Sequence, residues 1–349
     1  MPRRVYNLIL LATVVIVPTL AGVGWWHYWP TFHRRQSLVQ AQRAVEADNL
    51  VKAEELLHSL LDDEPKDLRS RFLYAQVLRK KGRITEAWNA LHQALQLGLP
   101  ESEGLREYAL LESVQDFPLA INALERVLEE HPDDAEVHKA LAEGYAKNKR
   151  WVEAERAYSR WLAVQPARAD LHLERGKVLL EAGRADQAAD EFQVVLRNAP
   201  QDFQARLLLA QCFMNDFKME EAESELQECR RLRPSASEPL VGLASCAAER
   251  GDGVHAQALA KEALALDPQS PLALHFQGSL FLTNHKLDLA IGIYEKIVRL
   301  YPRDKLGHLS LARAYSQLGN AELAKQHEER FRQLDLQDDQ RTKEMSRLH

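Results

Sequence analysis

The chain has 349 residues, with 45 Lys and Arg against 51 Asp and Glu, which gives a formal charge of −6. A hydrophobic fraction of 46%, with 15 Gly and 14 Pro, excludes a disordered or collagen-like chain. The acidic balance argues against a dedicated nucleic-acid binder, which carries a basic excess. Three Cys, an odd number, exclude a complete disulfide framework.

The first element in chain order is an apolar segment, Val5 to Trp29, that contains no Asp, Glu, Lys or Arg. As a helix it is roughly 37 Å long, enough to cross a hydrocarbon core of ~30 Å with some tilt. Its end carries Trp25, Trp26 and Tyr28 beside Trp29, and such rings prefer the membrane interface. Residues 1–33 therefore predict an N-terminal tail and a single transmembrane signal anchor.

A cleaved signal peptide is the alternative interpretation of the same segment. Thr19 to Ala21 offers small residues for cleavage, and the mature chain would then begin at Gly22. The apolar run is longer than a usual signal core and continues into four aromatic residues, so we favour the retained anchor.

The charges that flank the segment set its orientation only weakly. Arg3 and Arg4 precede it, and Arg34 and Arg35 follow it. A short basic N-terminal tail favours an N-inside anchor, which places the large C-terminal part on the extracytoplasmic side. Unpaired thiols favour a reducing compartment instead, so the side of the membrane stays open, with the extracytoplasmic side preferred.

The rest of the chain repeats itself. One alanine recurs at intervals of 34 residues, with a single interval of 33: Ala53, Ala87, Ala120, Ala154, Ala188, Ala222, Ala256, Ala290 and Ala324. A proline follows seven of these alanines by twelve residues: Pro65, Pro132, Pro166, Pro200, Pro234, Pro268 and Pro302. A small residue precedes eight of them by twelve: Ala41, Ala75, Ala142, Gly176, Ala210, Ala244, Gly278 and Ala312. Tyr108 is the exception at this small position, and Pro100 arrives one residue late.

Each of these residue types has a role in a pair of antiparallel helices. The small residue and the alanine let the two helices approach closely, and apolar spacings of three and four residues mark both helices as amphipathic. Gly82, Gly183, Gly251 and Gly319 fall where the chain must reverse, so a left-handed turn residue is predicted there. The proline ends the second helix, because it cannot donate the next backbone hydrogen bond.

This pattern resembles the tetratricopeptide repeat (TPR) family, in the form of a membrane-anchored bacterial-type TPR protein. The resemblance implies an all-α fold, a right-handed α-solenoid of about nine helix pairs after the anchor. The repeats fall near residues 34–67, 68–100, 101–134, 135–168, 169–202, 203–236, 237–270, 271–304 and 305–338. We expect the charged tail, residues 339–349, to fray. Glu328 in the last repeat, where a bulky apolar residue is expected, suits an outer face that no further repeat covers.

Motifs for catalysis and cofactor binding are missing from the sequence. It contains no P-loop, no dinucleotide-binding glycine motif, no H-E-x-x-H, no G-x-S-x-G and no C-x-x-C. His138, His172 and His308 share one phase of the repeat, so they are expected to follow the stack of repeats and not to converge on a metal. Cys212, Cys229 and Cys246 lie half a repeat apart and predict buried, unreactive side chains. We therefore expect no enzymatic activity, no metal, no cofactor and no small-molecule substrate.

The resemblance also implies a concave groove lined by positions two, five, nine, twelve and thirteen of each first helix. In repeats five to eight, the candidate partner-binding residues are Leu173, Lys177, Leu180, Leu207, Gln211, Met214, Val241, His275, Ser279 and Leu282. An apolar stripe in a groove is typical of a partner site, although some of these side chains can equally pack between repeats. Lys139 is the nearest match to a clamp for a C-terminal carboxylate, but Glu143 replaces the asparagine that such a clamp needs. An extended peptide or an amphipathic helix is the better occupant.

Two functional hypotheses follow from repeats and anchor together. The first is a membrane-tethered scaffold or adaptor that binds a peptide or helix of a partner protein in the groove. The alternative is an envelope assembly factor or holdase for unfolded or nascent clients. A scaffold copurifies with one stoichiometric partner, whereas a holdase binds denatured clients promiscuously. Regulation of an envelope enzyme through a metal-bearing tail is disfavoured, because the C-terminus has no paired cysteines.

Overall fold

The computed structural model describes residues 17–345, with side chains described for residues 32–338 and for residue 340. Over that range the chain forms eighteen α-helices and no strand. The predicted all-α fold of helix pairs is confirmed.

The helices alternate between a first and a second helix of each repeat. The first helices are α2 (Val17–Glu46), α4 (Leu68–Lys80), α6 (Glu101–Gln115), α8 (Ala135–Lys147), α10 (Ala169–Glu181), α12 (Phe203–Asn215), α14 (Glu238–Glu249), α16 (Pro271–Thr283) and α18 (Lys305–Gln317). The second helices are α3 (Leu50–Asp63), α5 (Ile84–Gln96), α7 (Phe117–Glu130), α9 (Trp151–Val164), α11 (Ala185–Asn198), α13 (Met219–Leu232), α15 (Gly253–Leu266), α17 (Leu287–Leu300) and α19 (Ala321–Met345).

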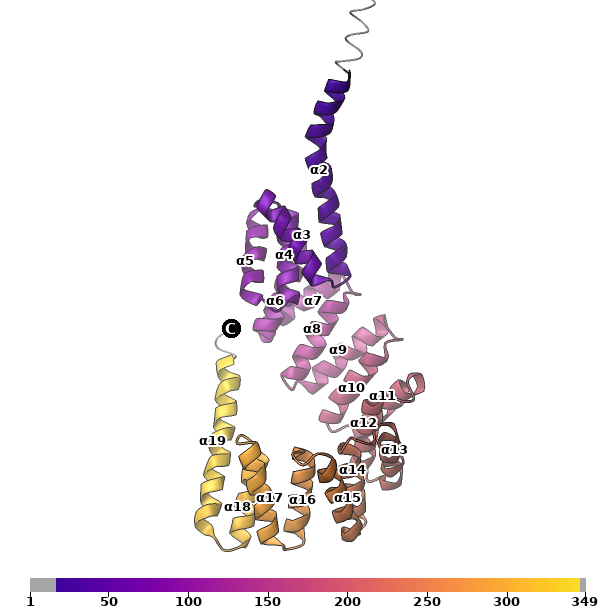
Figure 1. Cartoon of the computed structure of the whole chain (residues 1–349), viewed down its shortest axis with the longest axis vertical. Helices are drawn as coiled ribbons and strands as arrows, with labels where there is room; N and C mark the ends of the chain where they lie inside the picture. The colour runs from indigo at the N-terminus through magenta and orange to yellow at the C-terminus, as the bar shows by residue number, and fades with distance from the viewer. Residues whose placement is uncertain (1–16, 346–349) are drawn as a thin grey trace, which may run out of the picture. The chain divides into compact units, whose positions relative to one another are not determined.

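The chain divides into two compact units, residues 1–132 and residues 133–349. Within each unit every helix packs against the next one along the chain, as antiparallel neighbours (Figure 1). The first helices also touch one another: α2 contacts α4 in the first unit, and α10, α12, α14 and α16 contact in series in the second. Successive second helices share at most marginal contact over the described residues. In these repeats the first helices therefore lie closer together than the second helices, so we call their face the inner face.

Aspartate and serine side chains cap many of the helices. Asp67, Asp134, Asp202 and Asp304 each accept a backbone N–H from the first turn of the first helix that follows, and Ser270 does the same for α16. These oxygens satisfy donors that have no partner inside the helix. The aspartates that recur directly before the first helices therefore act as helix N-caps.

The repeated alanines form the centre of each stack. Eight of the nine are completely buried: Ala53, Ala87, Ala120, Ala154, Ala188, Ala222, Ala256 and Ala290. The ninth, Ala324 on α19, is only half-buried. Glu328 on the same helix is exposed, in agreement with the expected polar outer face.

The third repeat differs from the prediction in one respect. Tyr108 does not occupy the small position, since it is 43% exposed, and Ala109 is fully buried in its place. The reason is the turn inside the repeat. Only Asp116 separates α6 from α7, whereas three residues separate α4 from α5 and α8 from α9. Ala109 follows Ala75 by 34 residues, so the first helix keeps the regular spacing. The short turn after α6 accounts for the interval of 33 between Ala87 and Ala120.

Left-handed turn residues join the two helices of the other repeats. The four predicted glycines have positive φ, as expected: Gly82 (+75°), Gly183 (+76°), Gly251 (+80°) and Gly319 (+86°). Asp48, Lys149, Phe217 and His285 adopt the same conformation in the remaining turns. A side chain with a Cβ is disfavoured there by roughly 1–2 kcal/mol, so these four repeats carry local backbone strain.

A prediction on stability follows from the turns. Phe217 has φ +58° and its side chain is 78% exposed, so Phe217→Gly removes strain and little packing. We expect the free energy of unfolding to rise by about 1 kcal/mol. Gly183→Ala should lower it by about 1 kcal/mol, although a Cβ there meets no atom within 4 Å. Urea denaturation followed by circular dichroism measures both, and changes of the same sign would contradict this account.

The two ends of the chain extend beyond the predicted repeats. Residues 5–16 of the predicted anchor, Val5–Trp29, lie outside the described residues, and α2 begins at Val17 and runs unbroken past Pro30 into the first repeat. Among the described residues, no helix combines the length and apolar character needed to cross a bilayer. At the other end, α19 continues from the last repeat to Met345 and does not stop near residue 338. The helix therefore includes residues that were expected to fray.

Candidate functional site

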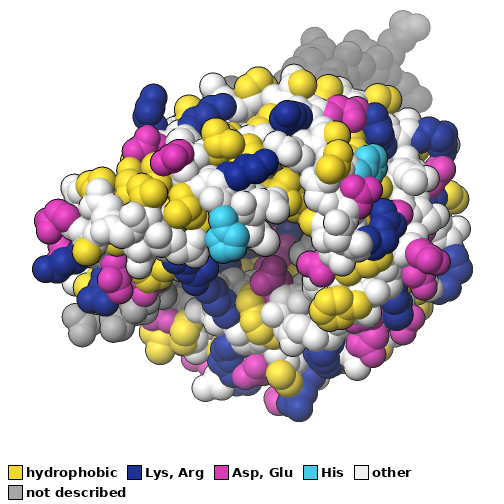
Figure 2. Space-filling view, turned by 90° about the horizontal axis from the view of Figure 1, so that it is seen from below, with side chains coloured by type: hydrophobic (Ala, Val, Ile, Leu, Met, Phe, Trp, Pro, Cys, Tyr) yellow, Lys and Arg dark blue, Asp and Glu magenta, His cyan; other side chains and the backbone are white. Residues whose placement is uncertain are grey.

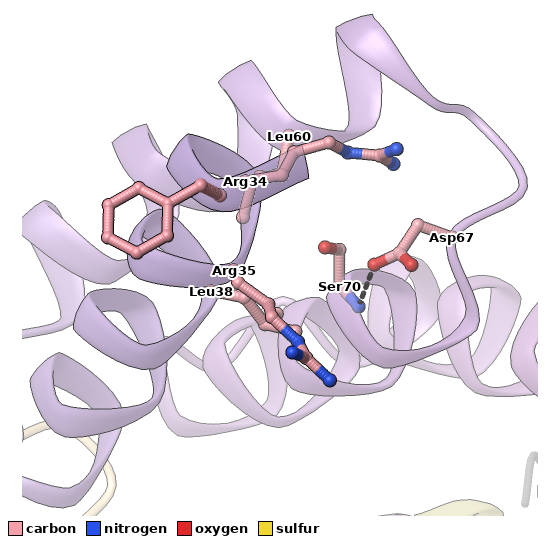
Figure 3. A pocket seen from close by; sticks show the side chains of 7 residues that line it. Arg34, Arg35, Leu38, Leu60, Asp67 and Ser70 are labelled. Atoms are coloured by element: carbon pink, nitrogen blue, oxygen red, sulfur yellow. Dashed lines mark hydrogen bonds between the residues drawn. The ribbon is translucent and has the colours of Figure 1, made fainter. Parts of the chain in front are cut away.

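A cavity near the first repeat is formed by α2, α3 and the start of α4. It has a volume of about 540 Å³ and is lined by Phe32, Arg34, Arg35, Leu38, Leu60, Asp67 and Ser70 (Figure 3). We call it the Arg35 cavity. Leu60 is only 4% exposed and forms part of its apolar wall, whereas Phe32 is 63% exposed. An exposed ring beside an apolar wall is typical of a surface that contacts something besides water.

The charges in the Arg35 cavity are only partly paired. Arg34 forms an ion pair with Glu64, while no described residue pairs with Arg35. Asp67 accepts the backbone N–H of Ser70 at 2.8 Å, and its other oxygen makes no ion pair with a described residue. The Ser70 side chain is almost fully buried, and its Oγ has no hydrogen-bond partner in the described structure. One cation, one anion and one buried hydroxyl are therefore left for a ligand.

A second cavity continues along the inner face between α2 and α4. It has a volume of about 310 Å³ and is lined by Leu38, Gln42, Val45, Glu46, Arg69, Phe72, Leu73 and Gln76. We call it the α2–α4 groove. Val45 and Phe72 are buried and form its floor, and Leu38 is shared with the Arg35 cavity. Arg69 on the rim forms an ion pair with Glu103 of α6.

Sequence reasoning missed both cavities, although a signal for the α2–α4 groove was present. In repeats one and two, positions two, five and nine of the first helix include Leu38, Gln42, Arg69, Phe72 and Gln76, all of which line this groove. The same rule that selected residues in repeats five to eight therefore finds the groove when it is applied to these repeats. Arg35 and Leu38 of the Arg35 cavity also fall at positions two and five of repeat one, but Leu60 comes from a second helix and Asp67 from a turn, so the rule finds only part of that cavity.

The candidate residues of repeats five to eight lie on α10, α12, α14 and α16, the first helices that contact in series. Gln211 and Ser279 are exposed on this face. Lys177 Nζ lies 2.7 Å from Glu174 Oε1, and His275 Nε2 lies 3.1 Å from Asp304 Oδ2, so both have partners within the stack. These polar candidates are accessible, but part of their hydrogen-bonding capacity is already used.

The apolar candidates are more buried than a partner surface requires. Val241 is 4% exposed and belongs to a core cluster, against which Leu207 and Met214 pack. Leu173 and Leu180 pack against a second cluster, and Leu282 against a third. Val241 is closed to a partner in this arrangement, because the neighbouring repeats cover it. The groove assignment for the others remains a prediction.

A third cavity, of about 230 Å³, lies on the second-helix side of the second unit. It is lined by Glu223, Gln227, Arg230, Leu243, Arg250, His255 and Leu259. Arg250 pairs with Glu223 and Arg230 pairs with Glu262, so its charges satisfy one another. The site has the character of a surface ion-pair network, worth little individually.

The three cysteines are free and completely buried, as predicted. Burial raises the pKa of Cys212 to about 12 and the pKa values of Cys229 and Cys246 to about 11. The thiols therefore stay protonated at neutral pH, where the thiolate is the reactive form. Among the residues that the structure describes, no group of three or more His, Cys, Asp or Glu is arranged to hold a metal.

Two histidines meet in the last repeat. Nδ1 of His308 on α18 lies 3.0 Å from Nδ1 of His327 on α19, and the Tyr315 ring stacks on His327 at 5.7 Å. Burial lowers the pKa of both histidines below the ordinary 6.5, and the charge of His308 lowers that of His327 further. Asp304, Glu295 and the Pro302 carbonyl oppose this effect, and Arg330 adds to it. Both rings are therefore neutral in the folded state at neutral pH.

A pH dependence follows for the α18–α19 hairpin. Its stability is complete above the unfolded-state pKa of about 6.5 and declines as the pH falls below it, because the unfolded chain then binds protons more readily. We expect hydrogen exchange, corrected for intrinsic rates, to show lower protection of α18 and α19 at pH 5.5 than at pH 7.5. The double variant His308→Gln, His327→Gln should lose this difference, whereas His92→Gln, which changes an exposed ring, should keep it. If protection falls equally between pH 7.5 and pH 5.5 in the unaltered chain and in both variants, the assignment to His308 and His327 is contradicted.

The molecular surface has a mixed charge. Figure 2 shows one face on which basic and acidic side chains are interspersed and no patch of one sign stands out. A nucleic-acid interface would instead concentrate Lys and Arg on one face. The face in view does not show that concentration.

Comparison with known proteins gives the family. One tetratricopeptide repeat model matches residues 38–100, 173–237 and 277–335, and a second matches residues 113–178. A curated relative, cellulose synthase operon protein C of Xanthomonas axonopodis pv. citri (strain 306), is 25% identical over 186 residues. That match covers 51% of this chain and only 12% of the relative.

Two solved structures are similar to this chain. TTC0263, a thermophilic TPR protein of Thermus thermophilus, is 20% identical with a TM-score of 0.45, covering 50% of this chain and 95% of that one. A tetratricopeptide repeat protein of Parabacteroides merdae ATCC 43184 is 17% identical with a TM-score of 0.44, covering 71% of this chain and 98% of that one. Because the first of the two repeat models alone matches more than half of the residues, the chain belongs to the tetratricopeptide repeat family.

Proposed function

We propose that this protein is a membrane-tethered scaffold that binds a segment of a partner protein on the inner face of its repeats, with the α2–α4 groove as a principal site. The TPR fold supports a role in protein–protein interaction in general. The observation that carries the choice of site is the α2–α4 groove, which lies between the first helices of repeats one and two and has an apolar floor.

The lining of the α2–α4 groove indicates what kind of segment it accepts. Phe72 and Val45 provide an apolar floor, and the amides of Gln42 and Gln76 lie along its sides. Apolar side chains of a peptide or helix can be buried on the floor, while the amides can pair with backbone N–H and C=O groups. This chemistry fits an amphipathic segment with one apolar edge.

Site-specific photocrosslinking in intact cells tests the site. A photoreactive residue at Gln76 of α4 should capture one stoichiometric partner, whereas one at Asn89, exposed on α5, should not. Gln211 on α12 and Ser224 on α13 are the positions in the second unit that are equivalent to Gln76 and Asn89. Photoreactive residues at these two positions test the candidates of repeats five to eight. Equal capture at inner and outer positions would contradict a groove. Many different clients at Gln76 would support the holdase alternative.

The membrane tether rests on the apolar run from Val5 to Trp29. The unbroken course of α2 from Val17 to Glu46 supports a stiff connection between that run and the first repeat. The full chain should remain in the membrane pellet after alkaline carbonate extraction, and a variant lacking residues 1–29 should be released. Sequencing of the mature N-terminus checks retention, and a start at Gly22 would refute the anchor.

The extracytoplasmic placement of the repeats needs a probe other than the native thiols. These are buried, with raised pKa values, so an impermeant maleimide should leave them unlabelled on either side. Lys325 on α19 has a side chain that is 74% exposed and suits replacement. We expect the Lys325→Cys protein to be labelled in intact cells whose outer barrier is permeabilised. Labelling only after lysis would place the repeats in the cytoplasm.

A further inference from the structure

We propose that the Arg35 cavity binds the headgroup of a phospholipid that carries both a phosphate and a primary ammonium, as phosphatidylethanolamine does. The proposal rests on the membrane tether and adds a lipid ligand at a site distinct from the α2–α4 groove. It stands on the position of the cavity along α2, on its unpaired charges and on its apolar wall.

The position of the cavity follows from the continuity of α2. Arg35 is six residues beyond Trp29 in one unbroken helix, which corresponds to about 9 Å along the axis. The headgroup layer is roughly 5–8 Å deep on each side of a bilayer. If Trp29 marks the edge of the hydrocarbon core, Phe32 and Arg35 lie in the headgroup layer or at its outer surface. A cavity at this level faces lipid headgroups.

The charges of the cavity match a zwitterion. Glu64 neutralises Arg34, which leaves the cation of Arg35 and the anion of Asp67. A guanidinium is well suited to a phosphate, and a carboxylate accepts hydrogen bonds from a primary ammonium. A headgroup with phosphate alone would place a negative charge near Asp67 without a compensating cation. The quaternary ammonium of phosphatidylcholine has no N–H to donate to Asp67.

The remaining lining residues suit the rest of the lipid. In Figure 3 the side chains of Arg34 and Arg35 extend on different sides of Ser70, whose buried Oγ has no partner among the described residues. That hydroxyl belongs to a residue of the cavity lining, and its hydrogen-bonding capacity is unused. Leu38, Leu60 and the exposed ring of Phe32 provide an apolar surface for the glycerol and upper acyl carbons. A volume of about 540 Å³ is in the range of small-molecule sites.

The test uses the full chain purified in a mild detergent, with phosphatidylethanolamine, phosphatidylcholine and phosphatidylglycerol added in equal amounts. Native mass spectrometry then counts the lipids that the protein retains. We expect one phosphatidylethanolamine, retained about tenfold more than either other lipid, since the preference depends on a charge-assisted hydrogen bond. Arg35→Gln should lower its retention about tenfold. Asp67→Asn should remove the preference over phosphatidylcholine while its amide oxygen still caps α4.

A matched control and a soluble competitor complete the experiment. Arg43→Gln changes an exposed arginine of α2 outside the cavity and should behave as the unaltered chain. Glycerophosphoethanolamine, which lacks acyl chains, should compete poorly, and full competition at micromolar concentration would assign the cavity to a soluble phosphoester. Equal retention of the three lipids, or a preference that survives Asp67→Asn, would overturn the proposal. Carbonate extraction of the same variants tests the tether separately, because none of these substitutions touches residues 5–29.

Discussion

Replacement of Glu191 by alanine should lower the free energy of unfolding around α9, α10 and α11 by about 3 kcal/mol. Glu191 on α11 is 7% exposed, and its carboxylate contacts two side chains of α10. Oε2 lies 2.7 Å from His172 Nδ1, and Oε1 accepts a hydrogen bond from Arg175. Arg175 also donates to Ser159 Oγ on α9 at 3.2 Å. Removing the carboxylate leaves a partly buried guanidinium without its counter-charge. Leaving one buried charge unpaired destabilises a protein more than replacing the whole pair does.

The measurement compares Glu191→Ala with Glu228→Ala in the full chain. Glu228 pairs with Arg231 on the surface of α13, where the two side chains are 41% and 65% exposed. Exposed pairs of this kind contribute little to stability. Urea denaturation followed by circular dichroism gives the global effect, and hydrogen exchange of α10 and α11 locates it, since a repeat array can open locally. An effect of Glu191→Ala no larger than that of Glu228→Ala would show that the network is merely a surface feature.

The repeat unit could be predicted from the sequence because its determinants are local and repeated. Each helix pair depends on a small residue, on an alanine twelve residues later and, in four repeats, on a turn glycine between them. The first two let the helices approach closely, and the glycine lets the chain reverse. Ala53, Ala154 and Ala256 are buried for this reason, although they are far apart in sequence. The third repeat shows the limit of counting. Its shortened turn moves the small position from Tyr108 to Ala109, and only the packing reveals which residue the neighbouring helix meets.

The candidate site was harder to predict because it depends on contacts between repeats. The family positions place the candidate residues on the first helices, but they do not say how deeply a side chain is buried between repeats. Val241 and Leu207 both stand at position five of their repeats, yet Val241 is covered by its neighbours and Leu207 is half-buried. The Arg35 cavity combines residues from three helices and a turn, with no spacing in common. No periodicity in the sequence could bring Phe32, Leu60 and Asp67 together.

Buried ion pairs were the other feature that the sequence concealed. Glu107 is completely buried on α6, and its Oε1 accepts from Arg79 Nε on α4 at 2.7 Å. Nothing distinguishes this glutamate from the exposed glutamates of the same helix until the helices are packed. Such pairs are weak evidence for stability, since both charges lose water.

Gly176→Ala should lower the free energy of unfolding by about 1–2 kcal/mol, against the intrinsic preference of a helix for alanine. A Cβ at Gly176 on α10 would lie 2.5 Å from Cε1 of Phe192 on α11. Phe192 is completely buried, so its ring has no free space into which to move. The cost of overpacking, about 1–3 kcal/mol, then exceeds the gain of up to about 1 kcal/mol in helix propensity.

A substitution of the same chemistry at Gly292 provides the control with the opposite sign. Gly292 lies on the exposed side of α17, and a Cβ there meets no atom within 4 Å. Gly292→Ala should therefore raise the free energy of unfolding by about 1 kcal/mol. Phe192→Leu, combined with Gly176→Ala, should show a coupling of at least about 1 kcal/mol in a double-mutant cycle. Additive effects of the two substitutions would mean that the close approach of α10 and α11 does not depend on the small residue, and the physical basis for the repeat pattern would fail with it.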